Sequence, residues 1–360
     1  MSFWQQLPKP IIAVAPMADV TDAPFRRLIA KYSEWPQQTA TVMWTEFVAA
    51  DGLMRATPEG KEKLMADLIY TEAERPIVAQ LFTSNVKHME AAARLCAELG
   101  FDGVDINMGC PDRTIEKQGC GSAMIKTPGI AKEIIRAAKR GAGKLPVSVK
   151  TRIGYNEDEI ETWLPALLGE SPAALTVHLR TRKQMSKVPA QWEKLPQIIA
   201  LRDKLSPGTI VLGNGDVLSA DDAREKAAAA GADGAMVGRA LFGNPWFFHP
   251  SKRLPVHLKA LPTKGVNRDT LYEAYEPIQG VELVSLEERL RVLVEHTKLF
   301  TSVLPFKNFN IMKKHYKAYV NSFPGAAELR AELMAAESPQ VVETIVEDFL
   351  AKHGRSATLS

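Results

Sequence analysis

Short apolar runs recur along the first two thirds of the chain, and each is followed by a stretch with helical spacing. Eight runs can be counted: 11–17, 41–47, 76–82, 103–108, 146–152, 174–179, 209–214 and 234–238. Because they are apolar along most of their length, they predict strands that are buried on both faces, as in a parallel sheet covered by helices. Eight such strand–helix units fit an α/β fold of the (β/α)₈ TIM-barrel type better than an open doubly wound sheet.

Capping signals place several of the helices between these runs. Helix starts are expected at Ser84, at Thr127 before Pro128, at Asn156 with Glu159, and at Ser219. Helix ends are expected at Gly100 and Gly231.

The pattern changes after residue 246. Residues 247–284 contain four prolines and no sustained period, which predicts a linker or an insertion on the barrel. From residue 285 on, four amphipathic segments follow, at 285–304, 306–323, 326–336 and 339–354, which is typical of a small helical bundle. We therefore expect a barrel domain over 1–246, the linker or insertion over 247–284, and a C-terminal α-helical domain over 285–360.

Composition narrows the class of protein. Hydrophobic residues make up 46% of the 360 residues and charged residues 24%, which excludes a disordered chain or a fibre. No apolar stretch approaches the roughly 18 residues of a membrane span, and the start lacks a secretory signal, so we expect a cytoplasmic protein. Three cysteines are few and odd in number, which fits a reducing compartment. With a formal net charge of only +3, a polyanion would have to be held by a local basic patch.

Polar or small residues close almost every apolar run. They are Met17, Glu46, Gln80, Asn107, Lys150 with Arg152, His178, Asn214, and Gly238 with Arg239. In a parallel barrel these strand ends converge on one face, where active sites lie. The set therefore predicts a site at that face.

One thiol stands at such a strand end. Cys110 follows Asn107 in NMGCP, and Pro111 biases it toward an extended turn. A thiol there could act as a nucleophile, a general acid or a metal ligand. A metal is disfavoured because no second Cys or His lies at ligand spacing. Cys96, in an apolar helix, is interpreted as structural. The role of Cys120 stays open, although its glycine-rich loop favours a small space-filling residue.

Glycine-rich turns follow the seventh and eighth runs. Gly213–Asp216 and Val237–Arg239 stand where barrels bind phosphate, since glycine lets backbone N–H groups approach the anion. Tight turns that merely require glycine are the alternative interpretation. Two such turns with an arginine favour phosphate.

A lysine buried at a barrel strand end needs an anion nearby. Lys150 could be the counter-ion of a reduced flavin, with Gln80 reading the pyrimidine edge of that ring, or it could form a Schiff base. Spacing alone leaves both interpretations open.

A basic strip lies in the helical region. Lys307, Lys313, Lys314 and Lys317 occur among aromatic residues, with no acidic residue from 305 to 320. Such a strip can hold RNA phosphates, although many such runs are only solvated helix faces.

Ordered motifs run through the whole barrel. They are APMADVTDAPFR (15–26), TEF (45–47), AQLF (79–82), GVDINMGCP (103–111), GCGSAM (119–124), SVKTRIG (148–154), VHLRTR (177–182), GNGDV (213–217) and VGRALFGNPW (237–246). With the tail segment 312–334, they make the chain resemble the tRNA-dihydrouridine synthase family of bacterial type. Two departures are Leu179, where many members have Gly, and Cys120, where Ala is usual.

The resemblance implies an FMN enzyme that uses NADPH to reduce the C5–C6 double bond of particular uridines in tRNA. Hydride would pass from flavin N5 to C6, and Cys110 would protonate C5. The flavin contacts it implies are Ala15, Pro16, Met17, Gln80, Lys150, His178, Asn214, Gly215, Asp216, Gly238 and Arg239. Asn107 and Arg152 would hold the uracil, and Arg180 would also contact the substrate. Lys313, Lys314 and Lys317 would bind the RNA backbone.

Two other functions are weighed against this one. An FMN barrel acting on a free pyrimidine or a small enone should lack a basic helical domain. A non-catalytic RNA-binding protein should not need Cys110 together with both phosphate turns. We expect a monomer that binds tRNA and needs neither a membrane nor a metal.

Overall fold

The computed structural model describes residues 2–34, 41–254 and 281–353. Their contacts divide the chain into two compact units, one made of 1–23 and 36–239, the other of 24–35 and 240–360. Each unit is described by itself.

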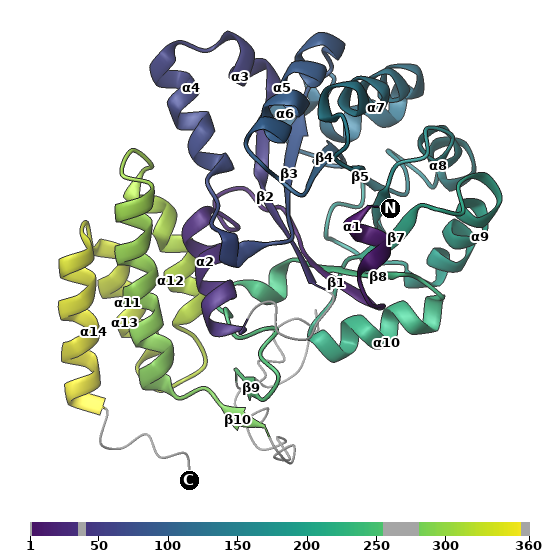
Figure 1. Ribbon diagram of the computed structural model, residues 1–360. Coiled ribbons are helices and arrows are strands. Elements are labelled where there is room, and N and C mark those ends of the chain that lie inside the picture. The colour runs from purple at the N-terminus through teal and green to yellow at the C-terminus, as the bar shows by residue number, and fades with distance from the viewer. Residues whose placement is uncertain (1, 35–40, 255–280, 354–360) are drawn as a thin grey trace. The chain divides into compact units, whose positions relative to one another are not determined.

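Eight parallel strands close into a barrel in the first unit, in the order β1 to β8 (Figure 1). Their bounds are β1 Ile11–Val14, β2 Thr41–Ala49, β3 Ile77–Phe82, β4 Gly103–Met108, β5 Val147–Arg152, β6 Ala174–His178, β7 Ile210–Asn214 and β8 Gly234–Val237. β1 pairs with both β2 and β8, which closes the ring. The predicted (β/α)₈ fold is confirmed, and the bounds of every predicted strand agree with the structure to within three residues.

Helices alternate with the strands along the chain. The main ones are α2 Ala23–Tyr32, α5 Val86–Glu98, α7 Pro128–Ala142, α8 Ile160–Leu168, α9 Leu195–Leu205 and α10 Ala220–Ala230. Shorter helices are α1 Phe3–Gln6, α3 Ala50–Arg55, α4 Pro58–Met65 and α6 Arg113–Glu116, with 3₁₀ turns at Ala66–Leu68, Glu72–Glu74, Gly121–Lys126, Trp192–Lys194 and Arg239–Leu241.

Two of the four predicted helix starts are confirmed. Thr127 precedes Pro128 at the start of α7, and the Ser219 side chain caps α10, which ends at the left-handed Gly231. The other two are wrong. Asn85, not Ser84, caps α5, because its side chain accepts the N–H groups of residues 87 and 88.

The second error concerns α8, which begins at Ile160 rather than beside Asn156. The Glu159 carboxylate accepts the Tyr155 N–H at 2.6 Å, and the Glu159 N–H donates to the Ile153 carbonyl at 2.8 Å. These bonds hold residues 153–159 in a turn of their own, so the helix starts later than the capping pattern predicts.

The barrel interior is a packed core. Trp4 of α1, fully buried, joins Ile11, Val42, Trp44 and other strand residues in one cluster, with its ring 5.6 Å from that of Trp44. Phe3 lies beside the start of β4, since a Cβ on Gly103 would meet its ring at 3.5 Å. α1 therefore covers the end of the barrel where the strands begin.

The second unit contains the four C-terminal helices, α11 Leu286–Val303, α12 Met312–Tyr319, α13 Ala326–Ala335 and α14 Pro339–His353. The second predicted segment is wrong in extent: 306–323 holds only a 3₁₀ turn, Phe309–Ile311, and α12, because Asn308 caps the turn and delays the helix. The greater part of α2 belongs to this unit by its contacts. Its Phe25 ring stacks on His296 at 5.3 Å, and Tyr32 donates to Glu295 at 2.6 Å.

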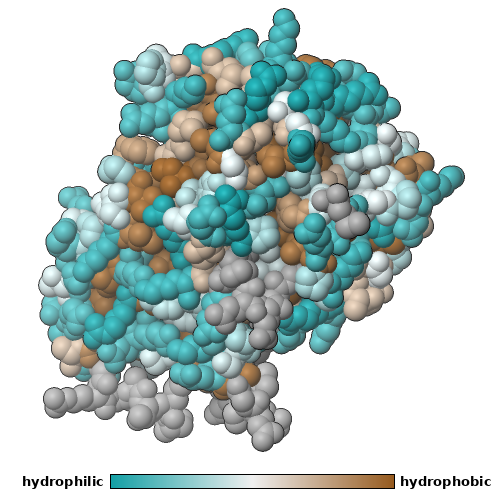
Figure 2. Space-filling view, viewed as in Figure 1, coloured by the Kyte–Doolittle hydropathy of each residue, from teal (hydrophilic) through white to brown (hydrophobic). Residues whose placement is uncertain are grey.

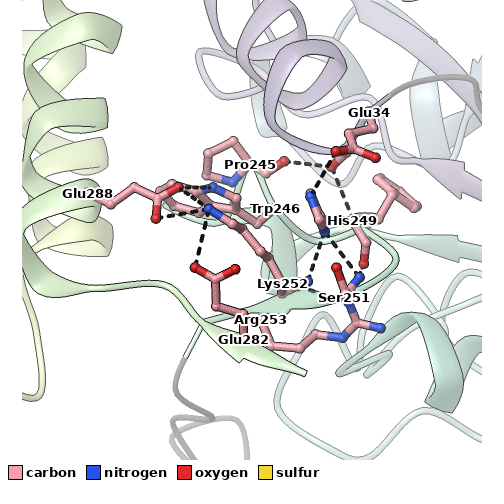
Figure 3. A network of polar contacts seen from close by, with 11 residues as sticks. Glu34, Pro245, Trp246, His249, Ser251, Lys252, Arg253, Glu282 and Glu288 are labelled. Atoms are coloured by element: carbon pink, nitrogen blue, oxygen red, sulfur yellow. Dashed lines mark hydrogen bonds and ion pairs between the residues drawn. The ribbon is translucent and has the colours of Figure 1, made fainter. Parts of the chain in front are cut away.

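A polar network in this unit ties residues near 249 to α11 (Figure 3). Lys252 contacts Glu288 at 3.1 Å and Glu282 at 3.8 Å, where β9 Lys252–Arg253 pairs with β10 Glu282–Leu283. His249 Nδ1 accepts the Lys252 N–H at 2.8 Å, and its Nε2 faces Glu34 at 3.3 Å. Most of the predicted linker, residues 255–280, lies outside the described residues.

None of the described helices combines the length and apolar character that a membrane span requires. The face in view in Figure 2 is mostly hydrophilic, with smaller hydrophobic areas among the charged side chains.

Candidate active site

The carboxyl ends of the strands, called the mouth of the barrel below, bring most of the predicted site residues together. Strand register pairs Asn107 with Lys150, Arg152 with His178, and His178 with Asn214. These side chains come from β4, β5, β6 and β7, so residues more than a hundred positions apart share one surface.

The loop that carries Cys110 is held on both sides. The Asn107 Oδ1 accepts the N–H groups of Gly109 at 3.2 Å and of Cys110 at 3.0 Å. The Cys110 carbonyl accepts from the Ser122 N–H and from its hydroxyl, each at 2.9 Å. Gly121 has φ +61, and a Cβ there would lie 2.6 Å from the Cys110 carbonyl oxygen, so glycine is required for this close approach.

Cys110 is partly exposed, whereas Cys96 and Cys120 are buried. Burial raises the pKa of the Cys110 thiol above its ordinary value, and the nearby Arg152 and Lys150 oppose this increase only in part. The thiol therefore holds its proton near neutral pH, which suits a proton donor better than a nucleophile.

Lys150 carries a charge without a carboxylate in contact. Its Nζ donates to the Asn214 side-chain oxygen at 3.2 Å, and no ion-pair partner lies within reach in the part of the chain that the structure describes. Burial, followed by the neighbouring Arg152, lowers the pKa of Lys150 to about 8. A bound anion would remove this cost, which fits the flavin counter-ion interpretation.

His178 is neutral. Burial, with Arg152, Lys150 and Arg180 nearby, holds its pKa well below 6.5. Its Nε2 lies 3.1 Å from Arg180 Nη1, and because a guanidinium can only donate, this nitrogen is the acceptor.

Two predicted substrate-binding arginines organise loops. Arg152, almost fully buried, donates to the carbonyls of Gly109 at 2.6 Å and Thr181 at 3.3 Å. Arg180 donates to the Val188 carbonyl at 2.6 Å and pairs with Asp216. Burial lowers the pKa of Arg152 to about 10.

The two glycine-rich turns form a cradle that suits a phosphate. Gly215 has φ +127 and Asp216 has φ 49. The backbone N–H groups of Asp216, Gly238 and Arg239 have no hydrogen-bond acceptor among the described residues. The Arg239 side chain is 63% exposed and donates to the Asp216 carboxylate at 2.5 Å. Asp216 therefore orients the side chains of Arg180 and Arg239, and it does not contact the anion itself.

The first strand ends beside this cradle. A Cβ on Gly238 would lie 3.5 Å from the Met17 sulfur and 3.7 Å from the Ala15 Cβ. Ala15 is buried, and Pro16 and Met17 are half-buried. The apolar wall that a flavin ring needs thus lies next to the donors that its phosphate needs, so these residues fit FMN.

Sequence reasoning missed Asp105, which lies wholly inside β4. Its Oδ2 accepts from the Gln80 amide at 2.7 Å, and the Gln80 carbonyl oxygen accepts from Asn107 at 3.1 Å. Gln80 is therefore engaged at both ends of its amide. The sequence did contain a signal for this residue, because Asp105 is the one acidic residue in the otherwise largely apolar segment 103–108.

The lysines of α12 are accessible within the helical unit. Lys314 and Lys317 are exposed and Lys313 is half-buried, whereas His315, Tyr316 and Tyr319 are buried. The tyrosines pack in the core of this unit, so they do not offer stacking surfaces for RNA bases.

Comparison with known proteins agrees with this arrangement. A family model described as dihydrouridine synthase matches residues 13–353. Probable tRNA-dihydrouridine synthase 2 of Bacillus subtilis (strain 168) is 36% identical over 353 residues, which cover 98% of each chain. Probable tRNA-dihydrouridine synthase of Staphylococcus aureus (strain COL) is 35% identical over 354 residues, covering 98% of this chain and 96% of that protein.

Likeness to solved structures is weaker. A variant of NCR from Zymomonas mobilis aligns with a TM-score of 0.42 at 18% identity, over 65% of this chain and 83% of that one, which carries no argument. The sequence relatives and the family model suffice: the chain belongs to the dihydrouridine synthase family of flavin-dependent oxidoreductases.

Proposed function

We propose that this protein is a tRNA-dihydrouridine synthase that binds FMN, takes its electrons from NADPH and reduces the C5–C6 double bond of particular uridines in tRNA. The observation that carries the proposal is the protonated, partly exposed Cys110 thiol, fixed at a barrel mouth that is rich in buried cations. We expect the protein to act in the cytoplasm as a monomer.

The residues present would hold FMN in a definite way. The free N–H groups of the two glycine-rich turns and Arg239 would bind its phosphate, Ala15, Pro16 and Met17 would line the ring, and Lys150 would neutralise its negative edge. His178 and Asn214 would contact its polar atoms, whereas Gln80, which is fully buried and bonded to Asp105 and Asn107, would support that edge from behind. A bound flavin supplies the hydride that the reduction at C6 requires.

The proton for C5 comes from Cys110 in this proposal. Its raised pKa keeps the proton on sulfur at neutral pH, and the positive charges of Arg152 and Lys150 stabilise the thiolate left behind. Donation to carbon, rather than attack by sulfur, is the role that this protonation state favours.

Substrate access requires that the uridine leave its stack, because a base inside folded tRNA cannot enter a barrel mouth. Asn107 and Arg152 would then donate hydrogen bonds to the uracil from the N–H groups that do not already bind the loops. Arg180 would also contact the substrate. Lys313, Lys314 and Lys317 would bind RNA phosphates.

Replacing the thiol tests the assignment of the proton donor. Cys110→Ala should lower dihydrouridine formation about 100-fold or more, since a positioned general acid contributes about 10² to 10⁴. The protein should keep its yellow flavin, and Cys96→Ala, which removes a buried thiol elsewhere, should behave as wild type. Dihydrouridine in unmodified tRNA transcripts, measured by mass spectrometry, is the readout. Wild-type activity in Cys110→Ala would disprove the role.

The competing function can be separated in the same assay. An enzyme for free pyrimidines would oxidise NADPH with uracil or uridine as readily as with tRNA. We expect oxidation to depend on tRNA, and identification of the flavin released by heating should give FMN.

A further inference from the structure

Behind the Cys110 loop, four buried polar side chains form a continuous chain of hydrogen bonds. We propose that Asp105 is a positioning residue, which fixes the Cys110 loop through Gln80 and Asn107. The inference rests on the proposed role of Cys110 as proton donor.

The contacts run in sequence from the barrel core to the mouth. Ser148 donates its hydroxyl to Asp105 Oδ1 at 2.5 Å, and Gln80 Nε2 donates to Asp105 Oδ2 at 2.7 Å. Asn107 Nδ2 donates to Gln80 Oε1 at 3.1 Å, and Asn107 Oδ1 accepts the Cys110 N–H at 3.0 Å. Asp105 and Gln80 are fully buried, and Ser148 and Asn107 nearly so.

Only one polarity satisfies this chain. An ionised carboxylate accepts hydrogen bonds and cannot donate, so the Gln80 amide must turn its NH₂ group toward Asp105. Its oxygen then faces Asn107, which must turn its own NH₂ group toward Gln80. The Asn107 oxygen is thereby directed at the N–H groups of Gly109 and Cys110. Reversing either amide would set donor against donor at the next link.

The Asp105 carboxylate, where this series of hydrogen bonds begins, is stabilised in its ionised form by its neighbours. Burial raises the pKa of Asp105 to about 6, and the bonds from Ser148 and Gln80, with the charge of Lys150, keep it from rising further. At pH 7 the carboxylate form therefore prevails and sets the direction of the chain.

A buried network could also serve stability alone, and reactivity at Cys110 separates the two roles. If Asp105 acts on Cys110, its loss must change the thiol as well as the melting temperature. Asp105→Leu removes the acceptor, whereas Asp105→Asn can offer Gln80 its oxygen and turn its NH₂ group to the Ser148 hydroxyl. The asparagine variant should therefore preserve the polarity.

The experiment measures alkylation of Cys110 by iodoacetamide in the flavin-loaded protein between pH 6 and pH 9, by peptide mass spectrometry. Released from Asn107, the loop should expose the thiol, and in Asp105→Leu the rate should rise about fivefold or more. The kcat for dihydrouridine formation should fall about tenfold to 100-fold, with the KM for tRNA changed less than about twofold, because a misplaced group loses orientation rather than binding. Asp105→Asn should stay within about threefold of wild type in both readouts.

A second variant keeps the test decisive if Asp105→Leu folds poorly. Gln80→Met has similar size and cuts the chain at its second link. It should speed alkylation as Asp105→Leu does, and adding Asp105→Leu to it should change nothing more, because coupled residues are not additive. Ser148→Ala, which leaves the Gln80 link intact, serves as control and should have a smaller effect.

Three results would overturn the inference: wild-type alkylation in both Asp105→Leu and Gln80→Met, full additivity of the two, or equal damage by Asp105→Asn and Asp105→Leu. Failure of the proposed function looks different. In that case wild-type protein makes no dihydrouridine, while the alkylation series still reports on the loop.

Discussion

The two ends of the barrel differ in how some of their charged side chains are compensated. At the end where strands begin, Asp233 accepts from Arg202 at 2.7 Å and pairs with Lys9, and Arg75 pairs with Asp102 at 2.9 Å. At the mouth, Lys150 meets only an amide oxygen and Arg152 meets backbone carbonyls.

The pKa directions follow this difference. Hydrogen bonds and charge from partner carboxylates raise the pKa values of Arg75 and Arg202, and Lys9 and Arg202 hold the pKa of Asp233 low. At the mouth, burial lowers the pKa values of Lys150, Arg152 and His178. Ion pairs compensate the charges where the strands begin. At the mouth, Lys150 and Arg152 have no carboxylate in contact, so a bound anion would be stabilised there.

Removing the least compensated cation should have the largest effect. Lys150→Met should lower kcat/KM for dihydrouridine formation about 100-fold or more, since it removes electrostatic stabilisation of the reaction. The flavin-free protein should lose little thermal stability, because the desolvation cost of this lysine disappears together with its support of the Asp105 carboxylate. A large drop in the melting temperature of the flavin-free variant would contradict the contrast between the two ends.

The opposite result is expected where the strands begin. Asp233→Ala leaves Arg202 without its buried carboxylate and should lower the free energy of unfolding by about 3 kcal/mol. Activity per folded molecule should not change. Chemical denaturation and tRNA turnover measure the two quantities, and a stability loss below about 1 kcal/mol would show that the pair is not a stabilising device.

The pH dependence of anion binding should reveal Lys150 directly. Its folded pKa of about 8 lies below the ordinary 10.5, so the flavin-free protein loses this charge as the pH rises through 8. The affinity for FMN should then weaken by up to about tenfold per pH unit above 8. Between the two pKa values the unfolded chain binds more protons, so the stability contributed by this lysine rises with pH.

Titration calorimetry from pH 7 to pH 9.5 checks that expectation. Lys150→Met supplies the control, since it should bind FMN weakly and without this pH dependence. A wild-type affinity that is flat over the same range would exclude Lys150 as the counter-ion.

The smallest effect is expected in the helical unit, at the exposed lysines of α12. Lys313 and Lys317 form no ion pair with any residue of the described ranges. Lys313→Glu with Lys314→Glu should weaken tRNA binding about fivefold at physiological salt and reduce the slope of log affinity against log salt by about 1.5. Lys352→Glu, at an exposed position of α14, is the control. An unchanged salt slope would identify the strip as a solvated face.

Much of the barrel could be predicted because its strands are continuous apolar runs and its turns need glycine at fixed places. The mouth could be predicted because polar residues ended those runs. The contacts between the residues could not: Gln80 and Asp105 meet across 25 positions, and Arg180 and Asp216 across 36. A motif gives residue types, whereas the partner of each side chain depends on strand register.

Helical periodicity misled in a different way. Tyr316 and Tyr319 share their short helix with exposed lysines, and alternation of aromatic and basic residues is equally typical of an RNA surface and of an amphipathic core helix. Burial decides between them, and burial depends on neighbours such as α11.

The membership of α2 has a consequence for how this protein can be divided. A helix encoded between the first two barrel strands shares its contacts with segments encoded after residue 240, and its Phe25 ring rests against His296 and His315. A protein truncated after β8 would therefore lack the residues against which α2 packs. The apolar side of α2 that holds Phe25 would then be exposed to solvent. Deletion of the C-terminal helices should therefore also destabilise α2, because it removes the residues against which α2 packs.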